Sequence, residues 1–418
     1  MKRNVIHTGD AFDALPDLDD NSVHAVVTDP PYGLAFMGRD WDDFEPKEYQ
    51  EWSERWARKC KRVLKPGGHL LAFSGNRTHH RLFTGVEDAG FEIRDTLTWH
   101  YGSGFPKASD VSKTIDKRAD VEPESVSDAE GVGFMNDDDD GWNDTQTHIK
   151  MGDPTTDAAR EWDGWKTGLK PATEFVVMAR MPFSGATVDC VLDHGTGALN
   201  IDGCRVGEDV DTSRPAGDMG ETQDKYGHYE GNQTNGSGTG GRYPANVVFD
   251  ETAADALDRE VGELGESKGV RGINGEQVYG NGDGYLGSMD AEGGQDVGFG
   301  DKGGPSRYFY TSKASRSERT ENGAIDNDHP TVKPIDLMEW LIKLVTREGQ
   351  TVLDPFAGSG TTCKAAKALG REFVGIERQD KWADVARVRC GLTPDDPSVV
   401  RTDDNQSGLE AYADGGEP

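Results

Sequence analysis

The sequence is poor in three features, and each shortage excludes a class of protein. Basic residues are scarce, because 45 Lys and Arg stand against 76 Asp and Glu, which gives a formal net charge of −31. No apolar run is long enough to cross a membrane and no signal peptide is evident, so we expect a cytoplasmic chain without a membrane partner. The five cysteines are odd in number and lack metal-ligand spacing, so neither a disulfide framework nor a metal site is predicted.

The clearest local signal is Asp29-Pro30-Pro31-Tyr32, directly after an apolar run over 23–28 that predicts a buried strand. Two successive prolines lack backbone donors and disfavour helix, so the chain should leave the sheet in a stiff, extended conformation. A carboxylate and an aromatic ring would then lie close together, as binding of an extruded nucleobase through its exocyclic amine requires. A plain turn is the alternative, and this motif alone does not decide between the two.

A second motif lies near the other end of the chain. Residues 351–362 predict a buried strand, a tight glycine loop and the start of a helix that ends at Gly370, and a further strand follows over 372–377. In nucleotide-binding α/β folds, an acid about 20 residues past the glycines holds the ribose hydroxyls, and Glu377 has that position. Dinucleotide and phosphate binding are competing interpretations, but the loop lacks G-x-G-x-x-G spacing and no G-K-[ST] follows.

Together the two motifs resemble those of the DNA amino-methyltransferases, which transfer a methyl group from S-adenosylmethionine to adenine N6 or cytosine N4. A third segment, 329–334 with the sequence HPTVKP, resembles the remaining cofactor motif of that family. The catalytic motif comes first and the cofactor motif last, which is the circularly permuted arrangement of the beta group. The resemblance covers roughly residues 1–110 and 305–395 and implies a doubly wound, Rossmann-like α/β methyltransferase fold, circularly permuted, with a large inserted target-recognition region.

The resemblance also assigns roles to individual residues. It implies that Asp29 and the Pro30 carbonyl accept the two N–H bonds of the target amine, while Tyr32 stacks on the flipped base. Methyl transfer would be a direct in-line displacement without a covalent enzyme intermediate or a metal. The implied catalytic residues are Asp29, Pro30, Pro31 and Tyr32, and the implied cofactor residues are Asp10, Ala11, Thr331, Lys333, Asp354, Pro355, Phe356, Gly358, Ser359, Gly360, Thr361, Thr362, Glu377 and Arg378.

The permutation predicts which segment lies beside the strand over 372–377. Residues 4–10 should supply the neighbouring strand, which would bring Asp10 over the adenine of the cofactor. In the family this position accepts a hydrogen bond from the adenine amine. A helix N-cap role for Asp10, with the helix beginning near Ala11, is an alternative that is compatible with the same position.

The middle of the chain differs from its ends, because hydrophobic periodicity fades there. Helices are predicted over 47–64 and 78–89, between strands over 68–74 and 91–99. The regions we expect are the catalytic half of the methyltransferase domain (1–118), an insert with the target-recognition region and flexible acidic or Gly-rich loops (119–304), the cofactor-binding half (305–394) and an acidic disordered tail (395–418). Ordered islands inside the insert are predicted at 174–180, 198–202 and 243–250. An insertion without any DNA contact is the alternative.

One segment at the end of this insert is locally basic. Lys313, Arg316 and Arg319 recur at every third residue and would face DNA phosphates together, although a salt-bridged helix start explains them equally well. Duplex binding usually draws on such residues to release counterions, so the net charge of −31 is unexpected in a DNA-binding protein. We therefore predict a halophilic protein whose surface carboxylates keep it hydrated in a high-salt cytoplasm.

The sequence thus predicts a site-specific methyltransferase that acts on adenine N6 of double-stranded DNA by base flipping. Asp at the first position of the catalytic motif is typical of the adenine enzymes of the family, whereas the cytosine-N4 enzymes more often carry Ser; cytosine N4 is the close alternative. A DNA-binding module that has lost turnover is disfavoured, because all motif residues are intact, and methylation of RNA or of a protein glutamine is weakened by Asp29. A cognate restriction endonuclease and a homodimer are further partners that the resemblance allows.

Overall fold

The computed structural model describes residues 2–34, 42, 44–102, 104, 108–121, 153–207, 240–264, 270–271, 295–296, 303–312, 316–329 and 331–400. The chain divides into two compact units. The larger unit combines Met1–Gly102 with Thr173–Pro418, and the smaller unit is Ser103–Ala172.

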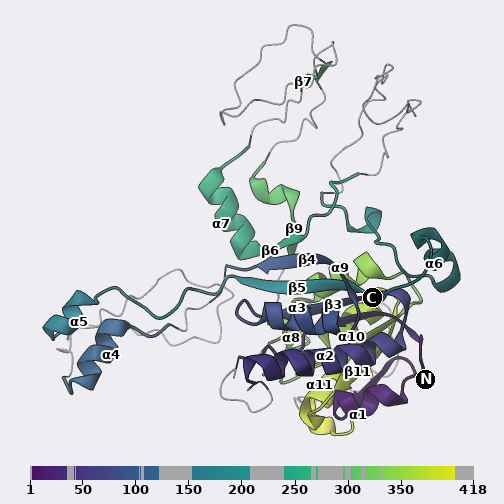
Figure 1. Ribbon diagram of the computed structural model, residues 1–418, viewed down its shortest axis with the longest axis horizontal. Helices are drawn as coiled ribbons and strands as arrows, with labels where there is room; N and C mark the ends of the chain where they lie inside the picture. Colours follow the sequence, from purple (N-terminus) through teal and green to yellow (C-terminus); the bar gives the residue numbers. More distant parts are fainter. Residues whose placement is uncertain are drawn as a thin grey trace. The chain divides into compact units, whose positions relative to one another are not determined.

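A mixed sheet runs through the described part of the larger unit, in the order β1-β11-β10-β2-β3-β5-β4-β6-β9 (Figure 1). Its strands are β1 (Val5–Thr8), β2 (Val23–Thr28), β3 (Leu64–Ser74), β4 (Glu92–His100), β5 (Thr173–Arg180), β6 (Val247–Asp250), β9 (Tyr310–Ser312), β10 (Thr351–Asp354) and β11 (Glu372–Glu377). The strands from β1 to β3 in this order are parallel, and β5 is antiparallel to both of its neighbours. A separate short pair joins β7 (Val270–Arg271) to β8 (Gln295–Asp296).

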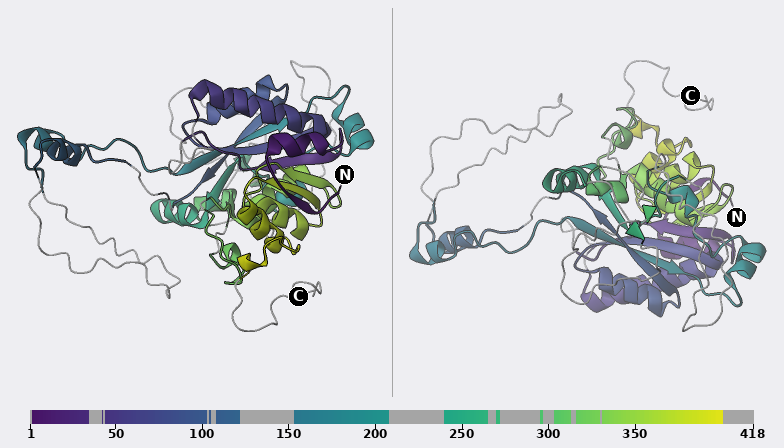
Figure 2. Two further views of the ribbon diagram at one scale, coloured as in Figure 1. Left: turned by 90° about the horizontal axis from the view of Figure 1, so that it is seen from below. Right: turned by 90° about the horizontal axis from the view of Figure 1, so that it is seen from above.

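Helices cover both faces of this sheet. The helices of the larger unit are α1 (Ala11–Ala14), α2 (Pro46–Val63), α3 (His79–Asp88), α6 (Thr187–His194), α7 (Glu251–Val261), α8 (Arg316–Arg319), α9 (Ile335–Val345), α10 (Thr361–Ala368) and α11 (Asp380–Arg389). Side chains alternate along a strand, so Ala25 and Val27 of β2 pack in one cluster with α9, α10 and α11, whereas Val26 packs in the other with α1, α2 and α3. Figure 2 shows the purple and blue helices and the green and yellow helices on opposite sides of the sheet.

The smaller unit contains α4 (Val111–Arg118) and α5 (Asp157–Glu161). The Asp116 carboxylate holds the two segments together, because it accepts hydrogen bonds from the backbone N–H of Thr155 at 2.8 Å and of Thr156 at 3.1 Å.

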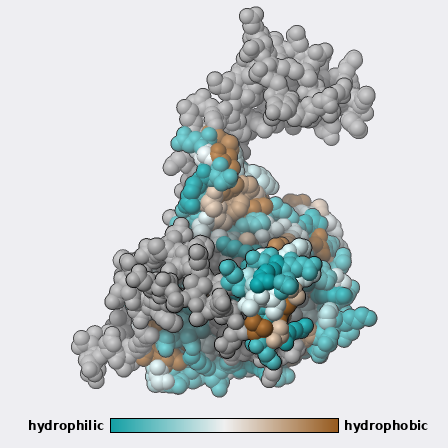
Figure 3. Space-filling view, turned by 90° about the vertical axis from the view of Figure 1, so that its left-hand side faces the viewer, coloured by the Kyte–Doolittle hydropathy of each residue, from teal (hydrophilic) through white to brown (hydrophobic). Residues whose placement is uncertain are grey.

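Within the described ranges, no helix of either unit is long and apolar enough to span a bilayer. On the face drawn in Figure 3, most described residues are hydrophilic and the apolar ones form small scattered patches.

Several predicted elements are confirmed. The helices α2 and α3 and the strands β3 and β4 lie where the periodicity placed them. The N-terminal strand β1 pairs in parallel with β11, with Val5 opposite Val374 and Thr8 opposite Glu377. The prediction that the N-terminus supplies the strand beside 372–377 is therefore correct.

The structure divides the middle of the chain differently from the prediction. Two islands expected inside the insert 119–304 are β5 and β6, which are strands of the central sheet, and only Ser103–Ala172 forms a unit of its own. The physical reason is the apolar run 176–179, which is buried and paired on both edges by β3 and β4. The island at 198–202 forms no strand and leads into a single 3-10 turn, Asp202–Cys204. Most of the acidic and Gly-rich stretches expected to be loops lie outside the described residues.

Residues 395–400, which were expected in the acidic tail, contact α11 and the segment at Ile325. The backbone N–H groups of Asp395 and Asp396 donate to the carboxylate of Asp384 on α11 at 2.7 and 2.9 Å. Val400 forms a bridge with Ile325, and both belong to a small apolar cluster with α11. Residues 395–400 are thus part of the larger unit, and 401–418 lie outside the described residues.

Candidate active site

The Asp29–Tyr32 segment begins where β2 ends, next to the end of β10. The two strand ends are joined by a hydrogen bond of 2.6 Å from the Thr28 hydroxyl to the carboxylate of Asp354. Asp354 is buried, and its carboxylate also accepts from the Phe356 N–H at 3.1 Å. Burial raises the pKa of Asp354 to about 6. The two motifs, more than 300 residues apart in sequence, therefore meet at one edge of the sheet.

Contacts beyond the prolines fix the conformation of the catalytic motif. The Tyr49 hydroxyl of α2 donates to the Pro31 carbonyl at 2.9 Å, and the Gly33 N–H donates to Asp42 at 2.6 Å. Gly33 has φ +66°, and a Cβ on it would lie 2.8 Å from the Tyr49 ring. A side chain at residue 33 would therefore be strained and would collide with the ring that holds the motif.

Four side chains from three separate segments form a charged cluster at this motif. The Lys333 ammonium donates to Asp29 Oδ2 at 2.7 Å and lies 3.2 Å from Glu174 Oε2. The Tyr32 hydroxyl lies 2.8 Å from Asp29 Oδ1 and 2.8 Å from Glu174 Oε2. A hydroxyl has a single proton, so Tyr32 donates to one carboxylate at a time. The Lys333 ammonium offsets the repulsion between the Tyr32 oxygen and the other carboxylate.

Burial makes this cluster electrostatically strong. Burial alone would lower the pKa of Lys333, but the carboxylates of Asp29 and Glu174 outweigh it and raise that pKa above its usual value. Burial and the same two carboxylates raise the pKa of Tyr32 well above its usual value. At neutral pH the cluster therefore contains an ammonium, a neutral phenol and two carboxylic groups.

The glycine loop between β10 and α10 has the geometry expected of a loop that lets backbone approach a ligand. Gly358 has φ +51° and Gly360 has φ +82°, a region that favours glycine. The Gly358 N–H donates to Glu377 Oε2 at 2.9 Å, and the Gln379 N–H donates to Glu377 Oε1 at 2.8 Å. Burial raises the pKa of Glu377. The acid at the end of β11 is thus held against the glycine loop.

The N-terminal strand reaches the same place. The Gly9 N–H donates to the Glu377 carbonyl at 2.8 Å. Asp10 follows, and its side chain caps α1 by accepting from the Phe12 N–H at 2.8 Å. The N-cap alternative for Asp10 is confirmed.

The third motif lies over the glycine loop. A Cβ on Gly358 would lie 3.1 Å from Nε2 of His329, and the His329 ring packs edge-on to Trp382 of α11 with 4.9 Å between centroids. Burial lowers the pKa of His329 to about 4, so its imidazole is neutral at neutral pH. The third motif therefore contacts the loop at Gly358 through His329 and the charged cluster through Lys333.

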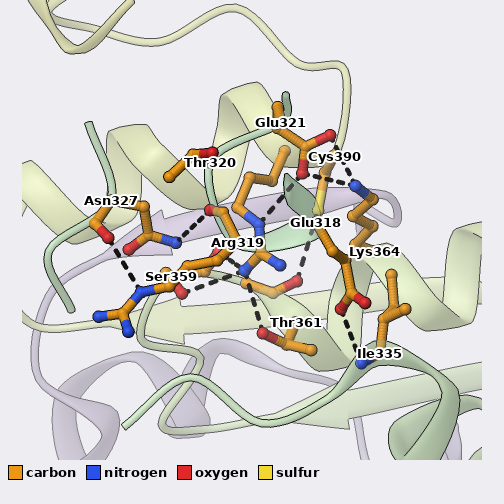
Figure 4. Close-up of polar contacts among 12 residues, drawn as sticks. Glu318, Arg319, Thr320, Glu321, Asn327, Ile335, Ser359, Thr361, Lys364 and Cys390 are labelled. Atoms are coloured by element: carbon orange, nitrogen blue, oxygen red, sulfur yellow. Dashed lines mark hydrogen bonds and ion pairs between the residues drawn. The ribbon is translucent and has the colours of Figure 1, made fainter. Parts of the chain in front are cut away.

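A second buried ionic network braces the glycine loop from behind. Arg389 of α11 donates to the Ser359 carbonyl at 2.8 Å, to the Ser359 hydroxyl at 3.1 Å and to the Thr361 hydroxyl at 3.0 Å. Its Nε lies 3.3 Å from Glu321, which also pairs with Lys364 of α10. Figure 4 shows Glu321 beside the Lys364 ammonium, with Ser359 and Thr361 on the other side of the network.

This network explains a local strain. Glu321 has φ +48°, which is uncommon for a residue with a side chain. Its carboxylate is held by Lys364 and Arg389, and these contacts offset the cost of that conformation. The turn after α8 is thus attached to α10 and α11, next to the glycine loop, through charged side chains.

The structure brings most of the predicted site residues together, with differences in detail. Lys333, which the resemblance assigned to the cofactor, contacts Asp29. The hydroxyls of Ser359 and Thr361 point to Arg389, so the loop backbone is the part left to face a cofactor. The Phe356 ring packs against Trp52 and Trp56 of α2, with centroids 5.4 and 5.5 Å apart.

The remaining assigned residues are placed as follows. Ala11 is buried at the start of α1, Thr362 is buried in the first turn of α10, and Arg378 is exposed directly after Glu377. Pro355 lies between Asp354 and Phe356, and the Thr331 N–H donates to His329 Nδ1 at 3.4 Å.

The basic segment is described only in part. Lys313 lies outside the described residues, and Arg316 begins α8. Arg319 donates through Nε to the Asn327 carbonyl at 3.1 Å and through Nη2 to the His329 carbonyl. Its guanidinium therefore holds the segment that carries the third motif.

Sequence reasoning missed Glu174 and Arg389. Glu174 stands at the start of an apolar strand without any motif around it, and Arg389 is one of several basic residues on α11. No local pattern distinguishes either residue, because their roles arise from tertiary contacts.

Comparison with known proteins matches most of the chain. A family model described as DNA methylase, for the N6/N4 methyltransferases, matches residues 23–184 and 222–387. The Type II methyltransferase M.HindIII of Haemophilus influenzae is 23% identical over 427 residues, which cover 93% of this chain and 95% of that protein. The Type II methyltransferase M.HpaI of Haemophilus parainfluenzae is 34% identical over 111 residues, which cover 25% of this chain and 34% of that protein.

Among solved structures, the cytosine-N4-specific PvuII DNA methyltransferase matches with a TM-score of 0.44 and 14% identity, over 98% of this chain and 89% of that chain. The complex of M1.HpyAVI with SAM matches with a TM-score of 0.37 and 16% identity, over 92% of this chain and 98% of that chain.

Proposed function

The chain belongs to the N6/N4 DNA methylase family, and from this premise we propose that it methylates adenine N6 in double-stranded DNA with S-adenosylmethionine as the methyl donor. The observation that supports this most strongly is the meeting of Asp29 and Asp354 at adjoining strand ends, joined through Thr28. A carboxylate suited to bind a nucleobase amine thus lies beside a loop suited to bind a nucleoside cofactor.

The residues at the glycine loop fit such a cofactor. Each oxygen of Glu377 accepts one backbone N–H, and a carboxylate oxygen has a second lone pair that can accept from a ribose hydroxyl. Asp10 caps α1 with one oxygen and keeps its other oxygen for the adenine amine. The cofactor supplies an electrophilic methyl group, and the chain binds and orients it.

The catalytic motif is built to bind the target amine. The amine is a poor nucleophile, because its lone pair is delocalised into the ring, and acceptors for both N–H bonds favour the form in which the lone pair is directed at the methyl group. Asp29 is one acceptor. The Pro31 carbonyl is occupied by Tyr49, whereas the Pro30 carbonyl accepts no hydrogen bond from the described residues and is the second acceptor. The Tyr32 hydroxyl is anchored, so its ring is oriented for stacking before the base arrives.

We further propose that the domain is circularly permuted, as in the beta group. The strands of the cofactor half, β10 and β11, come last in sequence but lie between β1 and β2 in the sheet. Target recognition would belong to the segments between β4 and β9 outside the sheet. Lys313 and Arg316, which follow β9, would contact DNA phosphates. Arg319, which was expected beside them, instead uses its guanidinium to hold the backbone of Asn327 and His329. A homodimer and a cognate restriction endonuclease belong to the same proposal.

Adenine is favoured over cytosine because the motif begins with Asp29. The cytosine-N4 reaction uses the same acceptors and is the second candidate, supported by the same geometry. The net charge of −31 further supports a halophilic enzyme, because dense carboxylates retain water when salt screens their repulsion.

Substitution of Asp29 tests the proposal. Asp29→Ala should abolish methyl transfer to DNA, while the affinity for the cofactor stays within a few fold of the wild-type value. The variant should still fold, because Lys333 keeps Glu174 as an ion-pair partner. Asp20→Ala, which removes an exposed carboxylate paired with Arg62, is the matched control and should leave both quantities unchanged. Loss of methyl transfer and cofactor binding together in the Asp29 variant would mean that the site is misplaced.

A further inference from the structure

Glu174 lies at the centre of the charged cluster although it belongs to none of the three motifs. It precedes the buried run of β5 and contacts both Tyr32 and Lys333. We propose that Glu174 is a positioning residue for methyl transfer, which holds the Lys333 ammonium between two carboxylates and leaves one net negative charge beside the target amine. This inference rests on the proposed function.

The cluster around Lys333 carries a net negative charge. Asp29 and Glu174 contribute two negative charges, Lys333 contributes one positive charge and Tyr32 is neutral, so the group carries a net charge of −1. Without Glu174, the ammonium would neutralise Asp29 and the net charge would be zero. Lys333 would also compete with the target amine for the Asp29 oxygens, since it already donates to one of them at 2.7 Å.

Methyl transfer moves positive charge toward this cluster. The methyl group carries positive charge to the amine nitrogen as the carbon–nitrogen bond forms and the carbon–sulfur bond breaks. The nitrogen is then cationic until it releases one proton to water. A negative cluster fixed beside that nitrogen stabilises the developing charge without rearranging, and such preorganisation is a large part of enzymatic rate enhancement.

The side chains of Glu174 and Lys333 are held in rigid surroundings. The residue after Glu174, Phe175, pairs with Ser74 of β3, and Glu174 itself pairs with Trp99 of β4. The Lys333 ammonium lies 5.0 Å from the centre of the Phe73 ring and 5.4 Å from that of Tyr32, and its side chain is only 7% exposed. Neither the Glu174 nor the Lys333 side chain can move far, so the ammonium stays between Asp29 and Glu174 when the target amine arrives.

The experiment compares Glu174→Gln, Lys333→Met and the double variant in methylation of DNA. The net charge of the cluster becomes 0 in the first, −2 in the second and −1 again in the double variant. Glu174→Gln should lower kcat by about tenfold or more, because the negative charge of the cluster is lost. Lys333→Met should also lower it by about tenfold or more, because the two carboxylates then repel each other and lose their fixed positions. The double variant has a single carboxylate and should recover to within about threefold of the wild type. The KM for the cofactor should change by less than about twofold throughout.

A matched control separates charge from structure. Glu92→Gln makes the same chemical change near the far end of the β4–β5 pair, where Glu92 pairs with Arg180, and kcat should not change. A purely structural role for Glu174 would make the double variant worse than either single variant, and that result would overturn the inference. An unchanged kcat in Glu174→Gln would also overturn it.

Two further outcomes are covered. If Glu174→Gln fails to fold, Glu174→Asp keeps the charge of the cluster at a shorter reach. A kcat within about threefold of the wild type supports the inference, and a loss of about tenfold or more overturns it. If the wild-type enzyme transfers no methyl group to DNA, the proposed function fails first, which distinguishes that failure from a failure of the role of Glu174.

Discussion

Removal of the Arg389 guanidinium tests how the fold supports the cofactor loop. In the wild type this side chain is fully buried and donates three hydrogen bonds to Ser359 and Thr361, besides its ion pair with Glu321. Arg389→Met would keep the apolar stem and remove all four contacts.

The size of the effect follows from these contacts. Removing one partner of a buried ion pair costs about 3–5 kcal/mol of unfolding free energy. Two features place the expected loss of unfolding free energy in Arg389→Met at the lower end of this range, about 3 kcal/mol. Glu321 retains Lys364, and Nη2 of Arg389 is buried without a partner among the described residues, so its removal relieves an unsatisfied donor. Release of the Ser359 carbonyl should also loosen the loop and weaken cofactor binding by about tenfold, or 1.4 kcal/mol.

Urea unfolding of the full chain and calorimetric titration with S-adenosylmethionine measure the two quantities. Lys381→Met on the same helix removes an exposed ion pair with Asp328, and should cost less than about 1 kcal/mol. If Arg389→Met unfolds at the same urea concentration as the wild type and binds the cofactor equally well, the glycine loop does not depend on this network and the reasoning is refuted.

Three further predictions concern pH, backbone strain and salt. Burial raises the pKa of Asp354 to about 6 in the folded state, above the unfolded value of about 3.9, so ionisation of Asp354 destabilises the fold as pH rises from 4 to 7. Asp354→Asn should remove this effect. The unfolding free energy of the variant, relative to that of the wild type, should therefore increase by up to about 3 kcal/mol over that pH range. A Cβ on Gly360 would lie 2.7 Å from the Cβ of Ala386, so Gly360→Ala should lower the unfolding free energy by about 2–5 kcal/mol. Gly349 has φ +74° and nothing within 4 Å of its added Cβ, so Gly349→Ala should lower it by only about 1–2 kcal/mol. Equal losses in urea unfolding would show that the contact with α11 is unimportant. Methyl transfer should rise with KCl into the molar range, and a decline above ordinary salt would remove the halophilic interpretation.

The parts of this fold that could be predicted are those with a strong local signal. The apolar run before Asp29 and the strand, loop and helix around Gly358 have short-range patterns that few structures satisfy. The pairing of β1 with β11 could be predicted because the motif order itself implies it. The N-cap role of Asp10 likewise follows from its position just before an apolar helix.

The parts that could not be predicted depend on long-range contacts. The β5 strand looked like an island within an insert, since nothing near Glu174 shows that 173–180 pairs between β3 and β4. Lys333 belongs to a recognisable motif, but its contact with Asp29 depends on how the third motif crosses the site. The bracing by Arg389 has the same origin, because Ser359 and Glu321 meet it only in the folded chain.

The most direct test expresses this chain in a host free of DNA methylation, under salt conditions that keep it folded. Sequencing that detects modified bases then shows which bases of the host DNA carry a new methyl group. We predict N6-methyladenine confined to one short sequence motif, and none of it with Asp29→Ala. N4-methylcytosine in its place would contradict the choice of base while keeping the mechanism. No modified base, together with no transfer of a radiolabelled methyl group to DNA in molar KCl, would contradict the proposed activity itself.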